Sequence, residues 1–332
     1  MARRVLYFLE RYSQISETYI ENELRALSPR NEVRIISTKV PDLPCEQHFP
    51  YQVIRSRAEL EVVIDEFQPD IIHGHYMTMA QNIMLAAKLA DAPYTIRAHS
   101  FDILGPMIER LPILRQTVNS DQCLGVLTFP FTVPLFERAG YNPYKVHGCF
   151  PVVNVERFED RGENGKAVMN VGACLPKKAM GGYLAIGAKV PDRRFNLYAL
   201  GYNVGDMHQH NAELGNPVTI VDPVQPEAML PEYKKHEWLL YTASPKLKTV
   251  GWPLAVAEAQ AAGVGVCVQN IRPDIKDYVG DCGFVFDTVE EAAKIISQPY
   301  PQELREQGFE LAKRSDVKRH IRLLEELWDQ AA

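Results

Sequence analysis

With 332 residues, the chain is long enough for two domains with separate cores. Its formal net charge of −6 argues against a nucleic-acid-binding protein, which needs a basic footprint. The sequence has no run of about 18 apolar residues, so it predicts no membrane-spanning helix. Its six cysteines are scattered and include no Cys-x-x-Cys pair. We therefore expect reduced core thiols in a cytoplasmic protein.

The first half of the chain alternates short apolar strands with helical patterns. Two of these helical patterns are residues 17–27 and residues 79–90. Short buried strands separated by helices are typical of a parallel, doubly wound sheet. The strands that we expect in this half are residues 4–9, 32–37, 70–75, 94–99, 123–129 and 145–150.

The second half repeats this organisation after a polar, glycine-containing stretch, Arg157–Lys166, which predicts a domain boundary. The closing segment has apolar residues at three-to-four spacing and is predicted to be helical. We expect one α/β domain over residues 1–156, a second over 157–305, and a C-terminal helix over 306–332. The expected strands of the second domain are residues 167–173, 195–201, 217–222, 238–244, 263–269 and 283–287.

Polar side chains follow several of these strands, at the edge where open α/β sheets bind ligands. Ser16, Glu17 and Thr18 follow the first strand and have the pattern of a helix N-cap with an acidic first turn. A purely structural cap is the alternative for this loop. His99 and Asp102 follow the fourth strand. They suit a general base and its orienting group, because imidazole titrates near neutral pH.

Two His-x-His pairs raise the question of a metal site. His73 and His75 end the third strand, but a metal ion needs further ligands and no such cluster is evident in the sequence. We therefore expect structural histidines there and no metal. His208 and His210 lie in a polar stretch that we expect to be a solvent-facing loop.

The segment Thr249–Gly263 joins two expected strands through a loop and a helix. The helix begins near Trp252 and Pro253, and proline suits the first turn because it lacks an N–H group. The free N–H groups and the dipole of a helix start favour a bound phosphate. Glu258 follows about a turn and a half later. This arrangement suits a nucleotide diphosphate and its ribose hydroxyls; an ordinary α/β crossover with a buried glutamate is the alternative.

The same segment, GWPLAVAEAQAAGVGV, resembles the donor-binding segment of retaining glycosyltransferases of family four, and other motifs extend this resemblance over most of the chain. They are SETYIENE, HGHY, RAHSFDI and VGACLPKKA. The resemblance implies the GT-B architecture, in which two Rossmann-like domains face each other across a cleft and a C-terminal helix crosses back to the first domain. It also implies a metal-independent reaction without a cofactor, in which a UDP-type or GDP-type sugar is the substrate.

The resemblance assigns roles to individual residues. It implies that His99 contacts the transferred sugar, that Lys178 neutralises the diphosphate and that Glu258 holds the ribose hydroxyls. It places Asp102 and Glu17 on the acceptor side. The remaining residues implied at the donor are Ser16 and Thr18 near the phosphates, Val224 near the nucleobase, and the helix start formed by Gly251, Trp252, Pro253 and Leu254.

The sequence departs from the family pattern at three positions. Ala173 replaces a phosphate-binding arginine, Ala179 replaces a glycine, and Val250 replaces a glutamate that contacts the sugar. The arginine is well shaped for bidentate phosphate contact. Lys246 and Lys248, just before the donor helix, are the candidates to supply the missing charge, and a solvated basic loop is the alternative.

We expect a retaining hexosyltransferase that transfers a sugar to the hydroxyl of a glycan, lipid-linked or small-molecule acceptor. Its role would lie in glycan, polysaccharide or glycoconjugate synthesis. The departures leave open a degenerate relative that binds nucleotide or glycan without turnover. An epimerase or a phosphorylase on the same fold is a further alternative. Residues 107–118 predict either a core helix or an amphipathic patch that contacts the inner face of a membrane.

Overall fold

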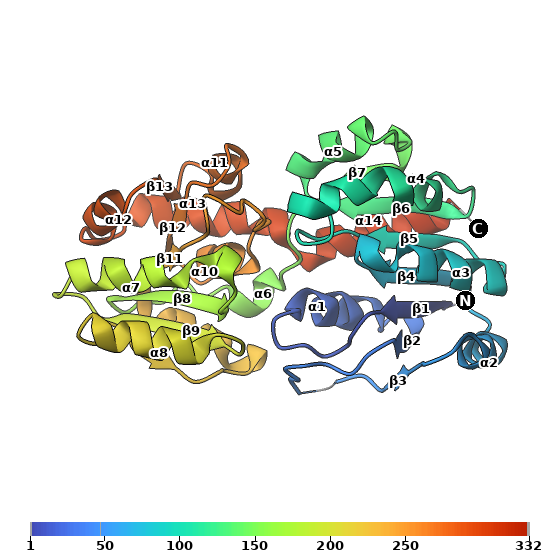
Figure 1. Cartoon of the computed structure of the whole chain (residues 1–332), viewed down its shortest axis with the longest axis horizontal. Helices are drawn as coiled ribbons and strands as arrows, with labels where there is room; N and C mark the ends of the chain where they lie inside the picture. The colour runs from blue at the N-terminus through green and yellow to red at the C-terminus, as the bar shows by residue number, and fades with distance from the viewer. Residues whose placement is uncertain (1, 47, 331–332) are drawn as a thin grey trace. The chain divides into compact units, whose positions relative to one another are not determined.

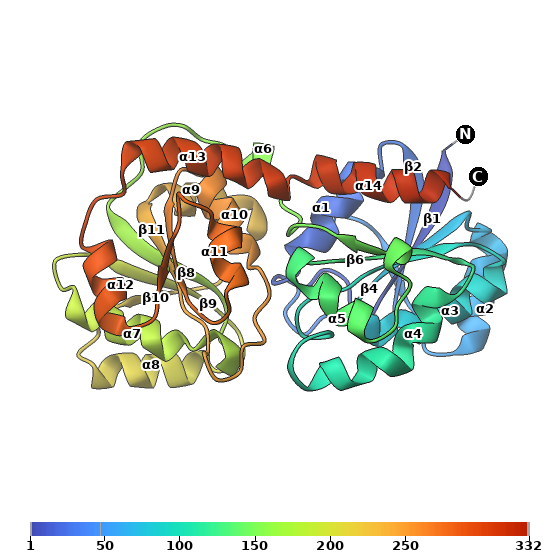
Figure 2. The same ribbon diagram turned by 90° about the horizontal axis from the view of Figure 1, so that it is seen from above.

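The structure is a computed structural model that describes residues 2–46 and 48–330. The chain forms two α/β units, each built on a parallel sheet (Figures 1 and 2). Unit 1 comprises the described residues of Met1–Val152 and Val317–Ala332, and unit 2 comprises Val153–Asp316. The chain therefore passes between units at residues 152/153 and 316/317, where the sequence analysis places its boundaries at 156/157 and 305/306.

The sheet of unit 1 has the strand order β3-β2-β1-β4-β5-β6-β7, and all pairings are parallel. Its central strands are largely buried and rich in apolar residues, as expected where helices cover both faces of a sheet. The strands are β1 (Arg3–Leu9), β2 (Asn31–Ser37), β3 (Tyr51–Val53), β4 (Ile71–His75), β5 (Tyr94–Arg97), β6 (Cys123–Thr128) and β7 (Val146–Gly148). Only β3 is missing from the sequence prediction.

The helices of unit 1 enclose a core of aliphatic and aromatic side chains. Ser56 caps one of them, since its hydroxyl accepts a hydrogen bond from the N–H of Glu59. The last helix packs on the first helix and on β6, and buries Leu324 and Trp328. The helices are α1 (Thr18–Leu27), α2 (Arg57–Phe67), α3 (Ala80–Ala90), α4 (Leu111–Asn119), α5 (Val133–Arg138) and α14 (Val317–Asp329).

Unit 2 repeats the architecture with the strand order β10-β9-β8-β11-β12-β13, again all parallel. Its strands are β8 (Ala167–Ala173), β9 (Phe195–Leu200), β10 (Thr219–Val221), β11 (His236–Tyr241), β12 (Gly265–Gln269) and β13 (Phe284–Phe286). Its helices are α6 (Val155–Phe158), α7 (Met180–Lys189), α8 (Val204–Glu213), α9 (Met229–Lys234), α10 (Leu254–Ala261), α11 (Asp274–Val279), α12 (Val289–Ile296) and α13 (Gln302–Ala312). The two parallel sheets confirm the predicted fold class.

Two local predictions are wrong. The C-terminal segment is not one helix from residue 306, because α13 ends at Ala312 and α14 begins at Val317. Asp316 between them is extended, with a ψ of 129°, which interrupts the helical hydrogen bonds. His208 and His210 lie on α8 rather than in a loop.

Within residues 2–46 and 48–330, no helix is both long and apolar enough to cross a bilayer.

Candidate functional site

Glu23 is the centre of a buried polar network in unit 1. It lies on α1 with no exposed surface, and its carboxylate forms an ion pair with Arg97 at the end of β5. Its Oε2 atom is 3.2 Å from Nε2 of His75 and 3.4 Å from Nε2 of His73, both on β4. Glu23 and Arg97 lie in the motifs SETYIENE and RAHSFDI, but the sequence assigned neither of them a role. The available signal was spacing: Glu23 is four residues after Tyr19 and therefore on the buried face of α1.

Glu23, His73 and His75 have the mutual distances of a metal site, since their ligand atoms all lie within 4.8 Å of one another. Their other contacts favour a hydrogen-bonded network instead. The guanidinium of Arg97 already neutralises Glu23, and Nδ1 of His73 lies 2.7 Å from the hydroxyl of Thr95. Burial lowers the pKa of His73 to about 4, so this imidazole is neutral near pH 7. Burial opposes ionisation of Glu23, but the charge of Arg97 outweighs it and holds the pKa well below the usual range.

His99 lies between this network and the surface. Its Nε2 atom is 3.1 Å from Nδ1 of His75, and its ring packs between the rings of Tyr19 and Tyr76, with centroids 4.4 and 4.5 Å away. Burial lowers the pKa of His99 well below its usual value, so the imidazole is neutral. Across the described part of the chain, no side chain hydrogen-bonds Nδ1 of His99. A neutral imidazole with one free nitrogen can donate to or accept from a ligand hydroxyl.

The described hydrogen bonds of Asp102 come from backbone N–H groups rather than from the imidazole of His99, so the base–orienter pair stays a prediction. The carboxylate is fully buried and accepts hydrogen bonds from two backbone N–H groups, that of His99 at 2.9 Å and that of Met77 at 2.6 Å. These bonds connect the loops that follow β4 and β5. Asp102 therefore fixes the backbone that carries His99.

The loop before α1 is held by Glu17 rather than capped by Ser16. Glu17 occupies the N-cap position without a side-chain capping bond, and its carboxylate accepts a hydrogen bond of 2.7 Å from the hydroxyl of Tyr76. Burial raises the pKa of Glu17 to about 7. Tyr76 has a φ of 75°, a strained conformation for a bulky residue. Ser16 is exposed and Thr18 is half-buried, so both hydroxyls reach the surface of unit 1.

Lys178 is a desolvated cation without a counter-charge in unit 2. It ends the 3₁₀ turn Pro176–Lys178 after β8, and its Nζ atom lies 5.5 Å from the ring centroid of Tyr241. None of the described carboxylates pairs with it, and burial lowers its pKa to about 8. Gly172, at a φ of 139°, leaves space for the ammonium, since a Cβ atom there would overlap Nζ. A bound anion would supply the missing partner.

The residues around Lys178 include two of the departures from the family pattern. Ala173 ends β8 and is buried, with 5% of its surface exposed. Ala179 has a φ of 45° and a ψ of 44°, the left-handed conformation that favours glycine. Ala179 therefore has the backbone conformation expected of a glycine at this position.

Arg272 and Asp274 hold the loop between β11 and α10 through hydrogen bonds. The sequence assigned no role to either residue. Nη1 of Arg272 donates hydrogen bonds of 2.7 Å to the carbonyl oxygens of Lys248 and Val250. Its Nε atom pairs with Asp274 at 2.8 Å, and Asp274 also accepts a 2.9 Å hydrogen bond from the indole of Trp252. The side chains of Val250 and Trp252 are buried, so these two residues support the loop.

The same loop carries two lysines and leads into the start of α10. Lys246 and Lys248 are both exposed. α10 begins at Leu254, and Pro253 is its N-cap residue. The sequence predicts a start near Trp252 and Pro253, about one residue earlier. Gly251, like Trp252, is buried, while Pro253 and Leu254 are half-buried. The first N–H groups of a helix have no partner within it, so this end is suited to an anion.

Glu258 lies on α10 and is half-buried. Its Oε2 atom accepts a 2.7 Å hydrogen bond from the hydroxyl of Tyr233 on α9. Burial raises the pKa of Glu258, while the Tyr233 hydrogen bond and the charge of Arg157 oppose this rise. Val224, in the loop after β10, is half-buried. The guanidinium of Arg157 donates a hydrogen bond to the carbonyl of Pro226 in the same loop.

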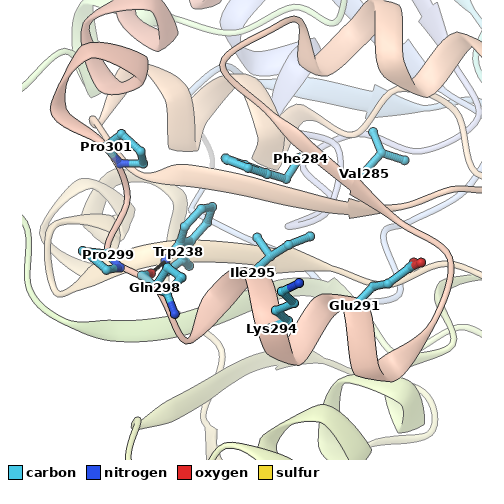
Figure 3. Close-up of a pocket in the computed structure, with 9 residues that line it drawn as sticks. All are labelled: Trp238, Phe284, Val285, Glu291, Lys294, Ile295, Gln298, Pro299 and Pro301. Atoms are coloured by element: carbon cyan, nitrogen blue, oxygen red, sulfur yellow. Dashed lines mark hydrogen bonds between the residues drawn. The ribbon is translucent and has the colours of Figure 1, made fainter.

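A separate apolar cavity of about 410 Å³ lies between α12, β13 and the segment 298–301 (Figure 3). Trp238, Phe284 and Ile295 form much of its wall, and Glu291 and Lys294 lie at its side. None of the predicted site residues lines it. Its walls offer few polar groups for a nucleotide, so this cavity is not the candidate site.

Comparison with known proteins gives a family match for part of the chain and a fold for the whole of it. Residues 3–112 match a family model described as glycosyl transferase 4-like. No curated protein matches the chain by sequence. The structure of Anabaena HepE in complex with UDP and glucose matches with a TM-score of 0.79 at 15% identity, covering 99% of this chain and 100% of that chain.

Two other solved structures agree with this result. Sucrose-phosphate synthase from Thermosynechococcus elongatus matches with a TM-score of 0.75 at 14% identity, covering 99% of both chains. The lipopolysaccharide outer core galactosyltransferase WaaB matches with a TM-score of 0.68 at 12% identity, covering 99% of this chain and 100% of that chain. The fold along the whole chain is therefore the GT-B fold of these proteins, and residues 3–112 match the glycosyl transferase 4-like family.

Proposed function

We propose that the chain is a retaining hexosyltransferase that transfers a sugar from a UDP-type or GDP-type donor to an acceptor hydroxyl. The acceptor would be a glycan, a lipid-linked sugar or a small molecule in glycan, polysaccharide or glycoconjugate synthesis. The observation that carries this proposal is Lys178, a half-buried, desolvated lysine that follows a strand and has no described carboxylate beside it. The complex of HepE with UDP and glucose, on the same fold, supports it.

Unit 2 would bind the donor. Lys178 and the backbone N–H groups from Gly251 to Leu254 would stabilise the leaving diphosphate, and Lys246 and Lys248 would add charge at its edge. Glu258 would accept hydrogen bonds from the ribose hydroxyls, and Val224 would pack near the nucleobase. Charge that develops on the leaving group is stabilised best by preorganised donors of this kind.

Unit 1 would hold the transferred sugar and the acceptor. His99 would contact the hexose through its free ring nitrogen, which Asp102 positions through the backbone. Ser16 and Thr18 would face the donor phosphates, and Glu17 would lie beside the acceptor. The departing phosphate oxygen would take the acceptor proton as the glycosidic bond breaks, so catalysis would rest on positioning and charge stabilisation.

We propose that this reaction needs neither a metal ion nor a cofactor. In metal-dependent transferases a divalent cation neutralises the diphosphate. Here Lys178 and the start of α10 would do so. Addition of EDTA should leave the rate unchanged, and a rate that recovers only with Mg²⁺ or Mn²⁺ would overturn this part of the proposal.

A relative that binds nucleotide without turnover is the second candidate, because Ala173 and Val250 remove two polar groups of the family's donor site. Isothermal titration with UDP and GDP, run beside a radiolabelled transfer and donor-hydrolysis assay, separates the two. Binding together with transfer or hydrolysis supports the transferase. Binding with no release of sugar to any acceptor or to water supports the second candidate. The absence of binding to either nucleotide would overturn both.

Contact with the inner face of a membrane is a further part of the proposal. α4 buries Leu111, Thr117 and Val118 but leaves Ile113 70% exposed, and Ile108 just before it is 41% exposed. Exposed apolar side chains beside Arg110 and Arg115 suit an anionic surface. The chain should sediment with phosphatidylglycerol vesicles and not with phosphatidylcholine vesicles. Equal sedimentation with both kinds of vesicle would overturn the proposed membrane contact.

A further inference from the structure

Tyr233 holds one oxygen of the carboxylate proposed to bind the ribose. Its hydroxyl donates a 2.7 Å hydrogen bond to Oε2 of Glu258. Tyr233 is fully buried on α9, and its ring packs edge-to-face on Phe158 of α6, with centroids 5.6 Å apart. Burial and the nearby Glu258 charge raise the pKa of Tyr233 well above its usual value, so the phenol remains a donor.

The second carboxylate oxygen of Glu258, Oε1, is available to accept hydrogen bonds from a ligand. No group in the described part of the chain hydrogen-bonds Oε1, whereas an ionised carboxylate can accept about four hydrogen bonds in total. A half-buried carboxylate with a single donor is under-solvated. Hydroxyl groups of a bound ribose would supply the remaining donors.

Arg157 connects this carboxylate to the loop that carries Val224. Its charge lowers the pKa of Glu258, and its guanidinium stacks on Phe158 and donates to the carbonyl of Pro226. Tyr233 and Arg157 thus act on Glu258 from neighbouring elements. The Tyr233 hydrogen bond and the Arg157 charge both favour an ionised carboxylate, and the hydrogen bond also fixes the position of Oε2.

We propose that Tyr233 is a positioning residue for nucleotide binding, whose hydroxyl fixes Oε2 of Glu258 so that Oε1 accepts the ribose hydroxyls. This inference rests on the proposed function of Glu258. Without the phenol, the glutamate side chain regains rotamers that it must lose again on binding, which costs affinity. Tyr233 itself would not touch the nucleotide.

The test is a cycle between a protein hydroxyl and a ligand hydroxyl, measured by isothermal titration on the full chain. The variant is Tyr233→Phe, and the probes are UDP and 2′,3′-dideoxy-UDP, or the GDP pair if the wild type binds GDP more tightly. We expect UDP to bind about tenfold more weakly to the variant, while the dideoxy probe binds wild type and variant alike. An equal loss for both probes would mean a general structural effect and would overturn the proposal.

Tyr198→Phe is the matched control. The hydroxyl of Tyr198 donates a 2.7 Å hydrogen bond to Glu232, the residue before Tyr233 on α9. This substitution therefore removes the same kind of buried phenol–carboxylate bond from the same helix, away from the candidate site. It should leave the affinity for UDP unchanged. A loss equal to that of Tyr233→Phe would assign the effect to α9 rather than to Glu258.

The pH profile gives a second readout. The ionised form of Glu258 accepts the ribose hydroxyls, so affinity falls as pH falls through its pKa. The Tyr233 hydrogen bond lowers that pKa, so its removal should move the acidic midpoint of UDP binding to higher pH. An unshifted midpoint would contradict the proposal.

Glu258→Gln separates this inference from the proposed function. If Glu258→Gln binds UDP as tightly as the wild type, the ribose role of Glu258 fails, and the role of Tyr233 fails with it. If Glu258→Gln weakens UDP binding and Tyr233→Phe does not, only the inference about Tyr233 fails.

Discussion

The two units treat their buried charges in opposite ways. In unit 1, Glu23 is surrounded by Arg97, His73 and His75, so its charge is satisfied within the fold. In unit 2, Lys178 has no carboxylate among its described neighbours, and Glu258 accepts one described hydrogen bond, from the phenol of Tyr233. Burial of a charge is costly unless something pairs with it. A satisfied charge therefore belongs to the architecture, whereas an unsatisfied one indicates a ligand.

The largest expected effect comes from breaking the satisfied network. Glu23→Gln would leave the guanidinium of Arg97 buried without a counter-charge. We expect the free energy of unfolding of unit 1 to fall by about 3–5 kcal/mol, measured by urea denaturation. Glu61→Gln, which breaks the exposed pair of Arg57 and Glu61, is the control and should cost under about 0.5 kcal/mol. Similar losses for both would contradict the comparison.

The pH dependence of the same network has a defined sign. The pKa of Glu23 is lower in the folded chain than in the unfolded chain. Its contribution is therefore complete above the unfolded value of about 4.3 and is lost as pH falls below it. Acid unfolding of the wild type should be steeper below about pH 4.3 than that of Glu23→Gln. Parallel curves would show that Glu23 does not carry this charge.

Lys178→Ala should have the opposite balance of effects. We expect UDP to bind about 100-fold more weakly, because the substitution removes the main positive charge that would pair with the diphosphate. The free energy of unfolding should stay level or rise, because an unpaired buried ammonium is lost. Lys177→Ala is the neighbouring control and should retain binding. A large loss of stability in Lys178→Ala would mean that the lysine is structural.

Exposed charges should matter less than buried ones. The double variant Lys246→Ala/Lys248→Ala should raise the Michaelis constant for the nucleotide sugar by about fivefold at low salt, and less at 0.5 M salt, because exposed charges are screened. Steady-state kinetics at both salt concentrations measures this. An unchanged constant at low salt would show that the two lysines form only a solvated loop.

The smallest effect is a gain. Ala179→Gly should stabilise unit 2 by about 0.5–1 kcal/mol, because Ala179 adopts the left-handed conformation that glycine adopts without strain. Ala259→Gly, inside α10, is the control and should destabilise by about 1 kcal/mol. Thermal unfolding distinguishes these signs. Destabilisation by both would mean that residue 179 is not strained.

Much of the fold could be predicted because buried parallel strands are short, mostly apolar runs. Such a run can be identified from the local sequence, without knowledge of the strand that it pairs with. Residues 167–173 match β8 in full. Tyr51–Val53 could not be found, since three residues are too short to show a pattern. The break at Asp316 was also hidden, because the apolar spacing of α13 continues in α14.

The candidate site was predicted in part, for a related reason. Lys178 follows a strand, and the sequence alone places it at the ligand-binding edge. Glu23 and Arg97 were assigned no role because a charged residue in a helix or strand is usually solvent-facing. Tyr233 and the loop contacts of Arg272 were missed because Glu258, Lys248 and Val250 lie more than 20 residues away in the sequence. Pairing between distant residues is a property of the fold rather than of any local motif.

Proton uptake on nucleotide binding tests the central claim most directly. The free chain holds Lys178 with a pKa of about 8, so at pH 8 about half of these side chains are uncharged. A diphosphate beside the ammonium would raise that pKa. Titration of UDP at pH 8, in buffers of different ionisation enthalpy, should show an uptake of up to about half a proton, which Lys178→Ala abolishes. Binding without net proton uptake, or uptake that persists in Lys178→Ala, would contradict the account.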